Sequence, residues 1–471
     1  MKERDLIIFG GGAGGLIVAS VAGQLGLKVT LIEKEDKLGG DCLHYGCVPS
    51  KTLIMSAKVA SLMRRGAEFG LDSIKPEVDL AKVNAHVKSV VEHIQQHDDP
   101  ERFRAYGCEI LLGQKAEFIS RHEVRVGEQV IKAKRFVIAT GTRPFIPSIK
   151  GLEETGFITN LDLFSLQSLP KRLVVLGGGA IGLEMGQALS RLGSQVTILQ
   201  RNNQILPQED SEVANALQDK LIKDGIVIHT GAKTKQVYRE SENIYIECEN
   251  GLKIETDQIL VATGRLPNVE NMGLEKAGIE YNTKGIIVDR RQRTSQKHIY
   301  ACGDICGPYQ FTHMAEYQAG IVISNAIFRF PKKTNYRVVP WVIYTDPELA
   351  RVGLTMQQAS EQGLNATELR FDFKDVDRAL TDVATSGFVK LVTHKGRILG
   401  ASILGAHAGE LLPEIVLAMQ AKIKISEISA AIHAYPTLAQ IHRRAVNSAY
   451  SPKLFSSKTK KIVKWINVLL P

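Results

Sequence analysis

The sequence predicts an α/β protein with two related strand–loop–helix–strand units and a smaller α+β domain after them. The first observation is a glycine-rich loop, Gly10–Gly15, which follows an apolar strand at 6–9 and opens a helical stretch. The second is a similar loop, Gly177–Gly182, which follows an apolar strand at 173–176. The third is a change to alternating strand signals after Pro340. The 471 residues are enough for two to four domains.

Both loops have the spacing Gly-x-Gly-x-x-Gly. Their glycines are Gly10, Gly12 and Gly15, and Gly177, Gly179 and Gly182. The first glycine permits a tight turn, the second lets the backbone approach a pyrophosphate, and the third lets the helix pack on the strand. In both units the second glycine lies 21 residues before the end of the next strand, at Glu33 and at Gln200. Two copies in the same surroundings predict two Rossmann-like dinucleotide-binding domains.

The segment between the two units predicts helices followed by short strands. The helices are expected at 54–65 and 83–103, and the strands at 109–112, 116–119, 123–126 and 135–139. The last strand runs into Gly141, and a similar strand ending downstream contains Gly264. These two glycines indicate either a close approach of the backbone to a dinucleotide or ordinary turns. A third ending of this kind places Asp304 directly after a strand.

The C-terminal part predicts strands at 388–393 and 398–404 and helices at 409–421 and 437–449. A basic tail, 451–471, follows, with five lysines and no acidic residue. The tail therefore carries five of the nine net positive charges, and the mildly basic body argues against nucleic-acid binding. Lysines and apolar residues alternate at 458–470, which is typical of a helix in weak peripheral contact with anionic lipid. Packing on a dimer or a frayed end explains the same pattern.

Six cysteines in a chain of this length argue against a disulfide scaffold. The N-terminus shows no secretory signal and no window is apolar enough to span a membrane, so we expect a cytoplasmic protein.

Cys42 and Cys47 lie in a glycine-containing loop directly after the first unit. Pro49 indicates that Cys47 sits at or just before a helix start, and a helix N-terminus favours a thiolate. Gly46 gives the loop the freedom to bring both cysteines within disulfide distance. A redox-active pair is favoured over a structural disulfide or two inert thiols. No metal site is predicted, because no further ligands stand at a suitable spacing.

The order of these motifs resembles the class I pyridine nucleotide–disulfide oxidoreductases, such as dihydrolipoamide dehydrogenase and mercuric reductase. The resemblance extends to about residue 450 and includes the Cys42–Lys51 segment and the turn at 300–304. It implies a discontinuous FAD-binding domain (1–150 and 271–339), an NAD(P)-binding domain (151–270) and a dimerisation domain (340–450). It also implies a homodimer, in which the C-terminal domain of one subunit completes the other subunit's site.

The resemblance assigns roles to individual residues. The FAD diphosphate and ribose are expected at Gly10, Gly12, Gly15 and Glu33, with Asp304 at the ribityl chain and Ala315 near the ring. The coenzyme is expected at Gly177, Gly179 and Gly182. Lys51 is expected to pair with Glu184 near the flavin. Electrons would pass from NAD(P)H to FAD, then to Cys47, and leave through Cys42 to a small thiol, disulfide or soft-metal acceptor.

The sequence departs from the disulfide-reducing relatives at two positions. Tyr435 and Gln440 stand where those relatives have a catalytic histidine and its glutamate partner. Dihydrolipoamide or glutathione turnover would then need His433 or His442 as the base. Tyrosine at this position resembles mercuric reductase, although residues 307–471 lack the further cysteine pair of those enzymes.

Coenzyme choice depends on Gln200 and Arg201, since a neutral residue followed by a guanidinium suits a 2′-phosphate. We therefore favour NADPH over NADH, while a solvated surface charge at Arg201 is the alternative. A second hypothesis for the whole chain is a redox-sensing or electron-carrier flavoprotein in which the cysteine pair registers oxidants or metal ions.

Overall fold

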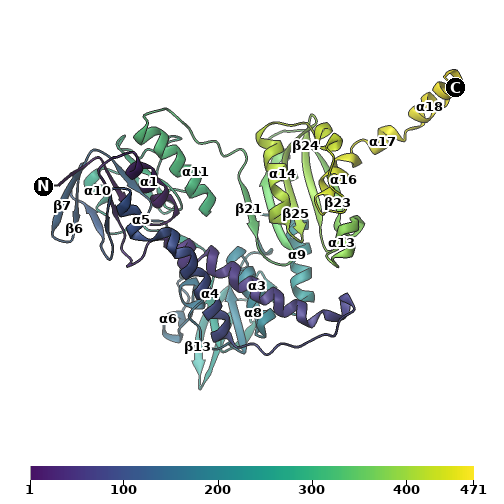
Figure 1. The fold of residues 1–471 in the computed structure, drawn as a ribbon. Helices are drawn as coiled ribbons and strands as arrows, with labels where there is room; N and C mark the ends of the chain where they lie inside the picture. Colours follow the sequence, from purple (N-terminus) through teal and green to yellow (C-terminus); the bar gives the residue numbers. More distant parts are fainter. Residues whose placement is uncertain (1, 471) are drawn as a thin grey trace.

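The computed structural model describes residues 2–470 and shows three lobes with a projecting C-terminal arm (Figure 1). This architecture confirms the expected α/β fold with two nucleotide-binding units and a C-terminal α+β domain. No helix within residues 2–470 has the length and apolar character needed to cross a membrane.

The first lobe contains a five-stranded parallel sheet in the order β20-β8-β2-β3-β4. Its strands are β2 (Leu6–Phe9), β3 (Val29–Ile32), β4 (Cys108–Leu111), β8 (Phe136–Ile138) and β20 (Ile299–Ala301). Helices α1 (Ala13–Gln24), α5 (Pro100–Ala105), α10 (Leu274–Ala277) and α11 (Thr312–Val322) belong to this lobe. A second sheet, β1-β7-β6-β5, comprises β1 (Lys2–Arg4), β5 (Ala116–Phe118), β6 (Glu123–Val126) and β7 (Gln129–Ala133). Strand β20 joins the sheet after the second lobe has been completed, so this lobe is discontinuous in sequence.

The second lobe repeats the architecture with a parallel sheet in the order β12-β11-β10-β16. Its elements are β10 (Arg172–Leu176), α8 (Ala180–Leu192), β11 (Gln195–Gln200), α9 (Ser211–Lys223), β12 (Val227–Thr230) and β16 (Gln258–Val261). Short helices α6 (Leu152–Thr155) and α7 (Asn160–Leu163) precede it. An antiparallel meander, β13 (Thr234–Glu240), β14 (Asn243–Cys248) and β15 (Lys253–Thr256), was not expected from the sequence.

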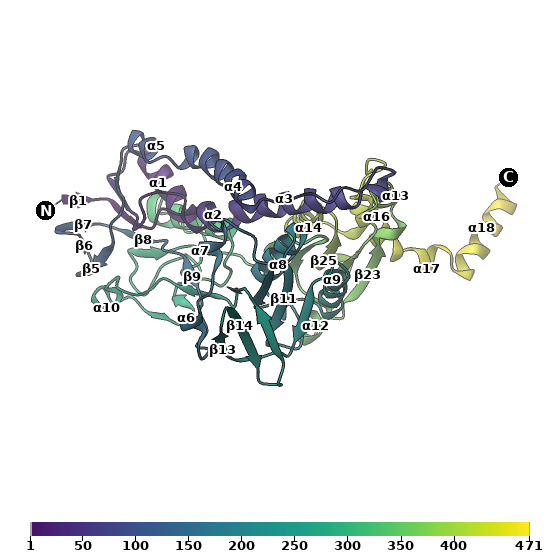
Figure 2. The ribbon, with the colours of Figure 1, turned by 90° about the horizontal axis from the view of Figure 1, so that it is seen from below.

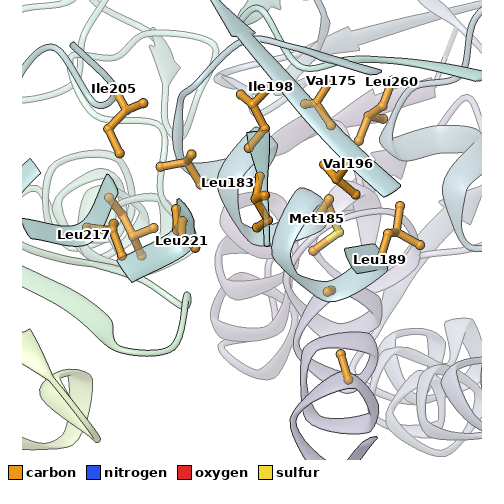
Figure 3. Packing of buried hydrophobic residues seen from close by; sticks show 14 of the residues in the cluster. Val175, Leu183, Met185, Leu189, Val196, Ile198, Ile205, Leu217, Leu221 and Leu260 are labelled. Carbon is orange, nitrogen blue, oxygen red and sulfur yellow. The ribbon is translucent and has the colours of Figure 1, made fainter. Parts of the chain in front are cut away.

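The core of the second lobe lies between its sheet and α8 (Figure 3). Leu183 and Leu189 of α8 pack with Val175 and Ile198 of the sheet, and all four are fully buried. Helices α3 (Cys47–Arg64) and α4 (Leu80–Gln95) come from the first part of the chain and join this core; α3 packs along α8 (Figure 2). The helix that begins at Cys47 is therefore anchored on the second lobe.

The third lobe is an antiparallel sheet in the order β21-β22-β25-β24-β23. Its elements are β21 (Pro340–Ile343), β22 (Glu348–Gly353), α12 (Met356–Glu361), β23 (Thr367–Asp372), α13 (Asp377–Thr381), β24 (Phe388–His394), β25 (Arg397–Gly405), α14 (Ala408–Gln420), α15 (Ile425–Ala430) and α16 (Gln440–Ser448). Helices α17 (Ser451–Leu454) and α18 (Ser457–Leu469) form the arm.

The prediction of a single helix at 83–103 was wrong. Helix α4 ends at Gln95 and α5 begins at Pro100. Asp99 caps α5, since its side chain accepts a hydrogen bond from the backbone N–H of Glu101 at 2.8 Å. Proline is favoured at a helix start and breaks a helix interior, so Pro100 marks a boundary.

Candidate functional site

A cleft of about 3030 Å³ runs between the lobes and is the setting for most of the predicted site residues. The cleft-lining residues among them are Gly10, Gly12, Glu33, Cys42, Cys47, Lys51, Gly141, Gly177, Gly179, Glu184, Arg201, Gly264, Asp304 and Ala315. A typical small-molecule pocket measures about 300–1,000 Å³. The cleft is thus large enough for more than one nucleotide.

The first glycine loop is shaped by close backbone packing. Gly10 has φ +99°, and a side chain there would collide with the carbonyl of Ala139. A side chain at Gly15 would collide with the carbonyl of Gly10. Glu33 fixes the loop, because its Oε2 accepts a hydrogen bond from the N–H of Gly11 at 2.6 Å. No side chain caps the N-terminus of α1 at Gly12, so the first N–H groups of α1 are available to a phosphate.

The second loop has the same geometry. Gly177 has φ +113°, and side chains at Gly177 and Gly182 would collide with backbone carbonyls. Gln200 corresponds to Glu33, because its Oε1 accepts a hydrogen bond from the N–H of Gly178 at 3.2 Å. Gly179 caps α8 without a side-chain hydrogen bond and faces open space. The two loops together fit two dinucleotides.

The strand endings bring further predicted residues to the cleft. Gly141 and Gly264 have φ +64° and +139°, and a side chain at either would meet open space. Asp304 is partly buried beside them and accepts a hydrogen bond from Thr142 Oγ1 at 3.1 Å. Burial raises the pKa of this carboxyl group above its ordinary value. Asp304 and the N-terminal part of α11, where Ala315 lies, line the cleft beside the glycine loop, and a side chain at Gly14 of α1 would contact Ala315.

The two cysteines lie on consecutive helices. Cys42 is on α2 (Gly40–His44), and Cys47 is the first residue of α3, as its sequence context predicts. Both are free thiols in this structure.

The environment of the pair separates the pKa values of the two thiols. The pKa of Cys47 is lowered to about 6, chiefly because the Cys42 thiol donates a hydrogen bond to it. The Thr312 hydroxyl, 3.5 Å from Cys47 Sγ, and the charge of Lys51 act in the same direction. The hydrogen bond to Cys47, together with burial, raises the pKa of Cys42. The reduced pair therefore holds its negative charge on Cys47 and its proton on Cys42.

Lys51 and Glu184 form an ion pair at the floor of the cleft, with Nζ 2.8 Å from Oε2. Glu184 is buried, and its Oε1 also accepts a hydrogen bond from the backbone N–H of Tyr344 at 2.8 Å. The Lys51 ammonium lies 4.4 Å from the centre of the Tyr344 ring. No sequence pattern marks Tyr344, which is distant from both partners along the chain.

Two further residues of α8 bind the same segment of the third lobe. Gln187 exchanges two hydrogen bonds with the backbone of Asp346, both 2.8–2.9 Å long. Arg191 lies 2.8 Å from the Asp346 carboxylate. Glu184, Gln187 and Arg191 therefore form one stripe on α8 that faces residues 344–346, a contact that sequence analysis missed.

Tyr435 lies outside the cleft, on the third lobe, and is 70% exposed. His433 lies outside the cleft, and both of its ring nitrogens face oxygen atoms of its own lobe. Its Nε2 lies 2.9 Å from Glu414 Oε1 and its Nδ1 lies 3.2 Å from the carbonyl of Ala431. His442 is fully buried, with Nε2 3.1 Å from the carbonyl of Leu411, and is a core residue.

Within residues 2–470, no three histidine, cysteine or acidic side chains gather as metal ligands. Three cysteines line the cleft, Cys42, Cys47 and Cys302, and of these Cys302 is buried.

Two family models match the chain. The model described as pyridine nucleotide-disulphide oxidoreductase matches residues 4–319, and that family's dimerisation domain matches residues 339–446. A Staphylococcus aureus mercuric reductase is 35% identical over 93% of this chain and 81% of its own length. A Bacillus subtilis dihydrolipoyl dehydrogenase is 35% identical over 95% of this chain and 96% of its own length.

Solved structures show the same fold. The copper(II) complex of the HOCl-induced flavoprotein disulfide reductase RclA from Escherichia coli matches with a TM-score of 0.85 and 27% identity, over 94% of this chain and 99% of that one. LpdA from Mycobacterium tuberculosis matches with a TM-score of 0.87 and 26% identity, over 95% and 100%. The expected cofactors, FAD and NAD(P)H, are those that this family uses. The chain therefore belongs to the class I pyridine nucleotide-disulphide oxidoreductases and is a flavoprotein oxidoreductase with a dimerisation domain.

Proposed function

We propose that this enzyme uses NADPH to reduce a thiophilic metal ion, copper(II) or mercury(II), held by Cys42 and Cys47. The observation that carries the proposal is the lack of an available base near Tyr435. Tyr435 carries a phenol in place of an imidazole, and His433 and His442 both lie outside the cleft and bind groups of their own subunit. A dithiol substrate needs a base to become a nucleophile, whereas a soft metal ion displaces the proton of a thiol as it binds.

In the proposed reaction, the reduced cysteine pair supplies both electrons that the metal ion receives. The Cys47 thiolate and the Cys42 thiol become one disulfide and release one proton and two electrons. Those electrons convert one mercury(II) ion to mercury(0), or two copper(II) ions to two copper(I) ions. The Cys47 thiolate supplies the first ligand, and the metal ion replaces the proton on Cys42. Among the relatives, the mercuric reductases and the copper(II) complex of RclA support metal ions of this class.

FAD, when bound, supplies the electron relay between the pyridine nucleotide and the disulfide. The residues that would hold it are Gly10, Gly12, Gly15, Glu33, Gly141, Asp304 and Ala315. The nucleotide would lie at Gly177, Gly179, Gly182, Gly264 and Arg201. The Lys51–Glu184 pair would keep a positive charge beside the Cys47 thiolate, since Lys51 already contributes to the low pKa of that thiol.

In a homodimer, Tyr435 would lie at the proposed site of the other subunit. Ile432 and Tyr435 are 97% and 70% exposed on the third lobe, which is unusual for two large apolar side chains so close together. In a homodimer built through the matched dimerisation domain, this loop would face the other subunit's Cys42. The proposed compartment is the cytoplasm, where a reduced cysteine pair is maintained.

The test is anaerobic turnover of the FAD-loaded protein with NADPH and a panel of acceptors. Copper(II) and mercury(II) are expected to support turnover at least about 100-fold faster than lipoamide or oxidised glutathione. Cys42→Ser should abolish it, and Cys248→Ala, which changes a buried cysteine of β14, should leave it unchanged. Faster turnover with lipoamide than with either metal would overturn the proposal. A single oxidation of the cysteine pair without further turnover would favour a redox sensor.

The protonation of Cys47 predicts a pH dependence for the reduced enzyme. Because the pKa of Cys47 is lowered to about 6, its thiolate is present above that pH and is lost as the pH falls through it. The long-wavelength absorbance of the reduced holoenzyme, which reports a thiolate next to flavin, should titrate with a midpoint near pH 6. Thr312→Val removes a hydroxyl 3.5 Å from Cys47 Sγ and should move the midpoint to higher pH. An unchanged midpoint would exclude a role for this hydroxyl.

Arg201 predicts a preference for NADPH over NADH. It is exposed at the end of β11, lines the cleft and has no ion-pair partner among residues 2–470. Because a charged hydrogen bond contributes about 1.5–3 kcal/mol, Arg201→Ala should lower kcat/KM for NADPH about 10- to 100-fold. The value for NADH should change little. Arg239→Ala, which changes a strand arginine of the same lobe outside the cleft, is the matched control.

A further inference from the structure

The C-terminal arm is an amphipathic helix outside the matched family domains. Helix α18 spans Ser457–Leu469, whereas the dimerisation domain ends at residue 446. Ser456 caps the helix, because its side chain accepts a hydrogen bond from the backbone N–H of Thr459. The arm projects away from the third lobe in both views (Figures 1 and 2). The hydrogen bonds that α18 makes within residues 2–470 reach no further than Lys453 of α17.

One face of α18 is apolar and solvent-exposed. Ile462, Trp465, Ile466 and Leu469 follow the spacing i, i+3, i+4, i+7, which places them on one side of a helix. They are 48%, 68%, 44% and 55% exposed. A contiguous apolar face of this kind on an isolated helix requires a partner, because leaving it in water is unfavourable.

The charge of the arm identifies the partner. Lys460 and Lys464 lie on the opposite side of the helix and Lys461 lies at the edge of the apolar face, and residues 451–471 contain five lysines and no acidic residue. Lysines flanking an apolar face with a tryptophan are the arrangement of helices that lie in the interface of an anionic bilayer. An apolar groove on a partner protein would explain the apolar face of α18 but not the five lysines, which have no acidic residue beside them in the tail. Nucleic acid would explain the lysines but not the apolar face.

We propose that α18 docks the enzyme on an anionic membrane surface, with Ile462, Trp465, Ile466 and Leu469 inserted at the headgroup boundary and the lysines facing the lipid phosphates. The arm projects from the third lobe, and none of its residues lines the cleft. Two arms in a homodimer would bind the same bilayer together, so the dimer would bind more tightly than one helix alone.

The experiment compares the full-length holoenzyme with point variants by co-sedimentation with vesicles. The vesicles are phosphatidylcholine with and without phosphatidylglycerol. We expect binding only when phosphatidylglycerol is present, and weaker binding at high salt. Deletion of residues 456–471 should abolish it.

Two matched substitutions test the face. Ile466→Ser removes an aliphatic side chain from the apolar face and should weaken binding about tenfold or more. Val468→Ser removes one from the lysine side, where the side chain is 74% exposed, and should change binding little. The fluorescence of Trp465 should shift to the blue on binding, and Trp465→Phe should lose that shift.

Several results would overturn the proposal. One is failure of the full-length protein to sediment with phosphatidylglycerol vesicles, and another is sedimentation of the deletion variant with them as strongly as the full-length protein. Equal losses of vesicle binding in Ile466→Ser and Val468→Ser would also contradict it. A deletion variant that sediments as a monomer while the full chain is a dimer would assign α18 to the subunit interface instead.

Discussion

Replacing Cys42 by serine is expected to reduce metal-dependent NADPH oxidation by at least about 1,000-fold while leaving the Cys47 thiolate in place. Cys42 carries the exchangeable proton of the reduced pair, and the disulfide cannot form without its sulfur. The serine hydroxyl still donates a hydrogen bond to Cys47, so the pKa of Cys47 stays below that of a free thiol. The measurements are steady-state turnover and the long-wavelength absorbance of the holoenzyme.

Two controls separate loss of the sulfur from loss of the hydrogen bond. Cys42→Ala removes both, so the thiolate band should titrate at higher pH than in Cys42→Ser, because the Cys42 hydrogen bond is the largest cause of the low pKa of Cys47. Cys47→Ser should lose both the band and turnover. Metal-dependent turnover that survives in Cys42→Ser would show that the metal is reduced elsewhere.

Installing a base is expected to convert the enzyme towards dithiol chemistry. The double variant Tyr435→His with Gln440→Glu should raise dihydrolipoamide-dependent activity by about 100-fold or more, because a positioned general base contributes about 10²- to 10⁴-fold. Tyr435 is exposed and Gln440 begins α16, where its amide lies 3.3 Å from the carbonyl of Ala434. The loop between them therefore already holds both positions close together.

The gain should show the titration of an imidazole, rising as the pH passes about 6.5. Tyr435→Phe removes the phenol without adding a base and should bring no gain, which controls for loop disturbance. If the double variant forms a stable dimer and dithiol turnover stays at the wild-type level, the missing base is not what limits this substrate class.

The parts of the fold that local chemistry dictates could be predicted. At Gly10 and Gly177 the backbone has a positive φ and a side chain would collide with a backbone carbonyl. A loop of this shape therefore requires glycine at this position, which makes it recognisable in the sequence. The break between α4 and α5 was missed, although Asp99 and Pro100 are a local capping signal. The meander β13–β15 was missed although Ile244, Ile246 and Cys248 alternate with less buried residues along β14, which is the period-two pattern of a strand.

The site was predictable only where residues are close in sequence or where a resemblance supplies the pairing. Cys42 and Cys47 are separated by five positions, so their pairing follows from the loop. Lys51 and Glu184 are 133 positions apart, and without the resemblance each is a surface charge on a helix. The engagement of His433 by Glu414 depends on the packing of a loop against α14, which no local pattern encodes.

The stripe of Glu184, Gln187 and Arg191 on α8 has a consequence for recombining these enzymes. The proposed coenzyme-binding segment, 151–270, resembles an interchangeable cassette, but one face of its helix α8 contacts both Lys51 and residues 344–346. A chimera that imports this segment from a relative inherits whatever side chains the donor has at those three positions. Whether those three side chains fit Lys51 and residues 344–346 of the recipient, rather than overall sequence identity, should decide which donors yield a folded chimera.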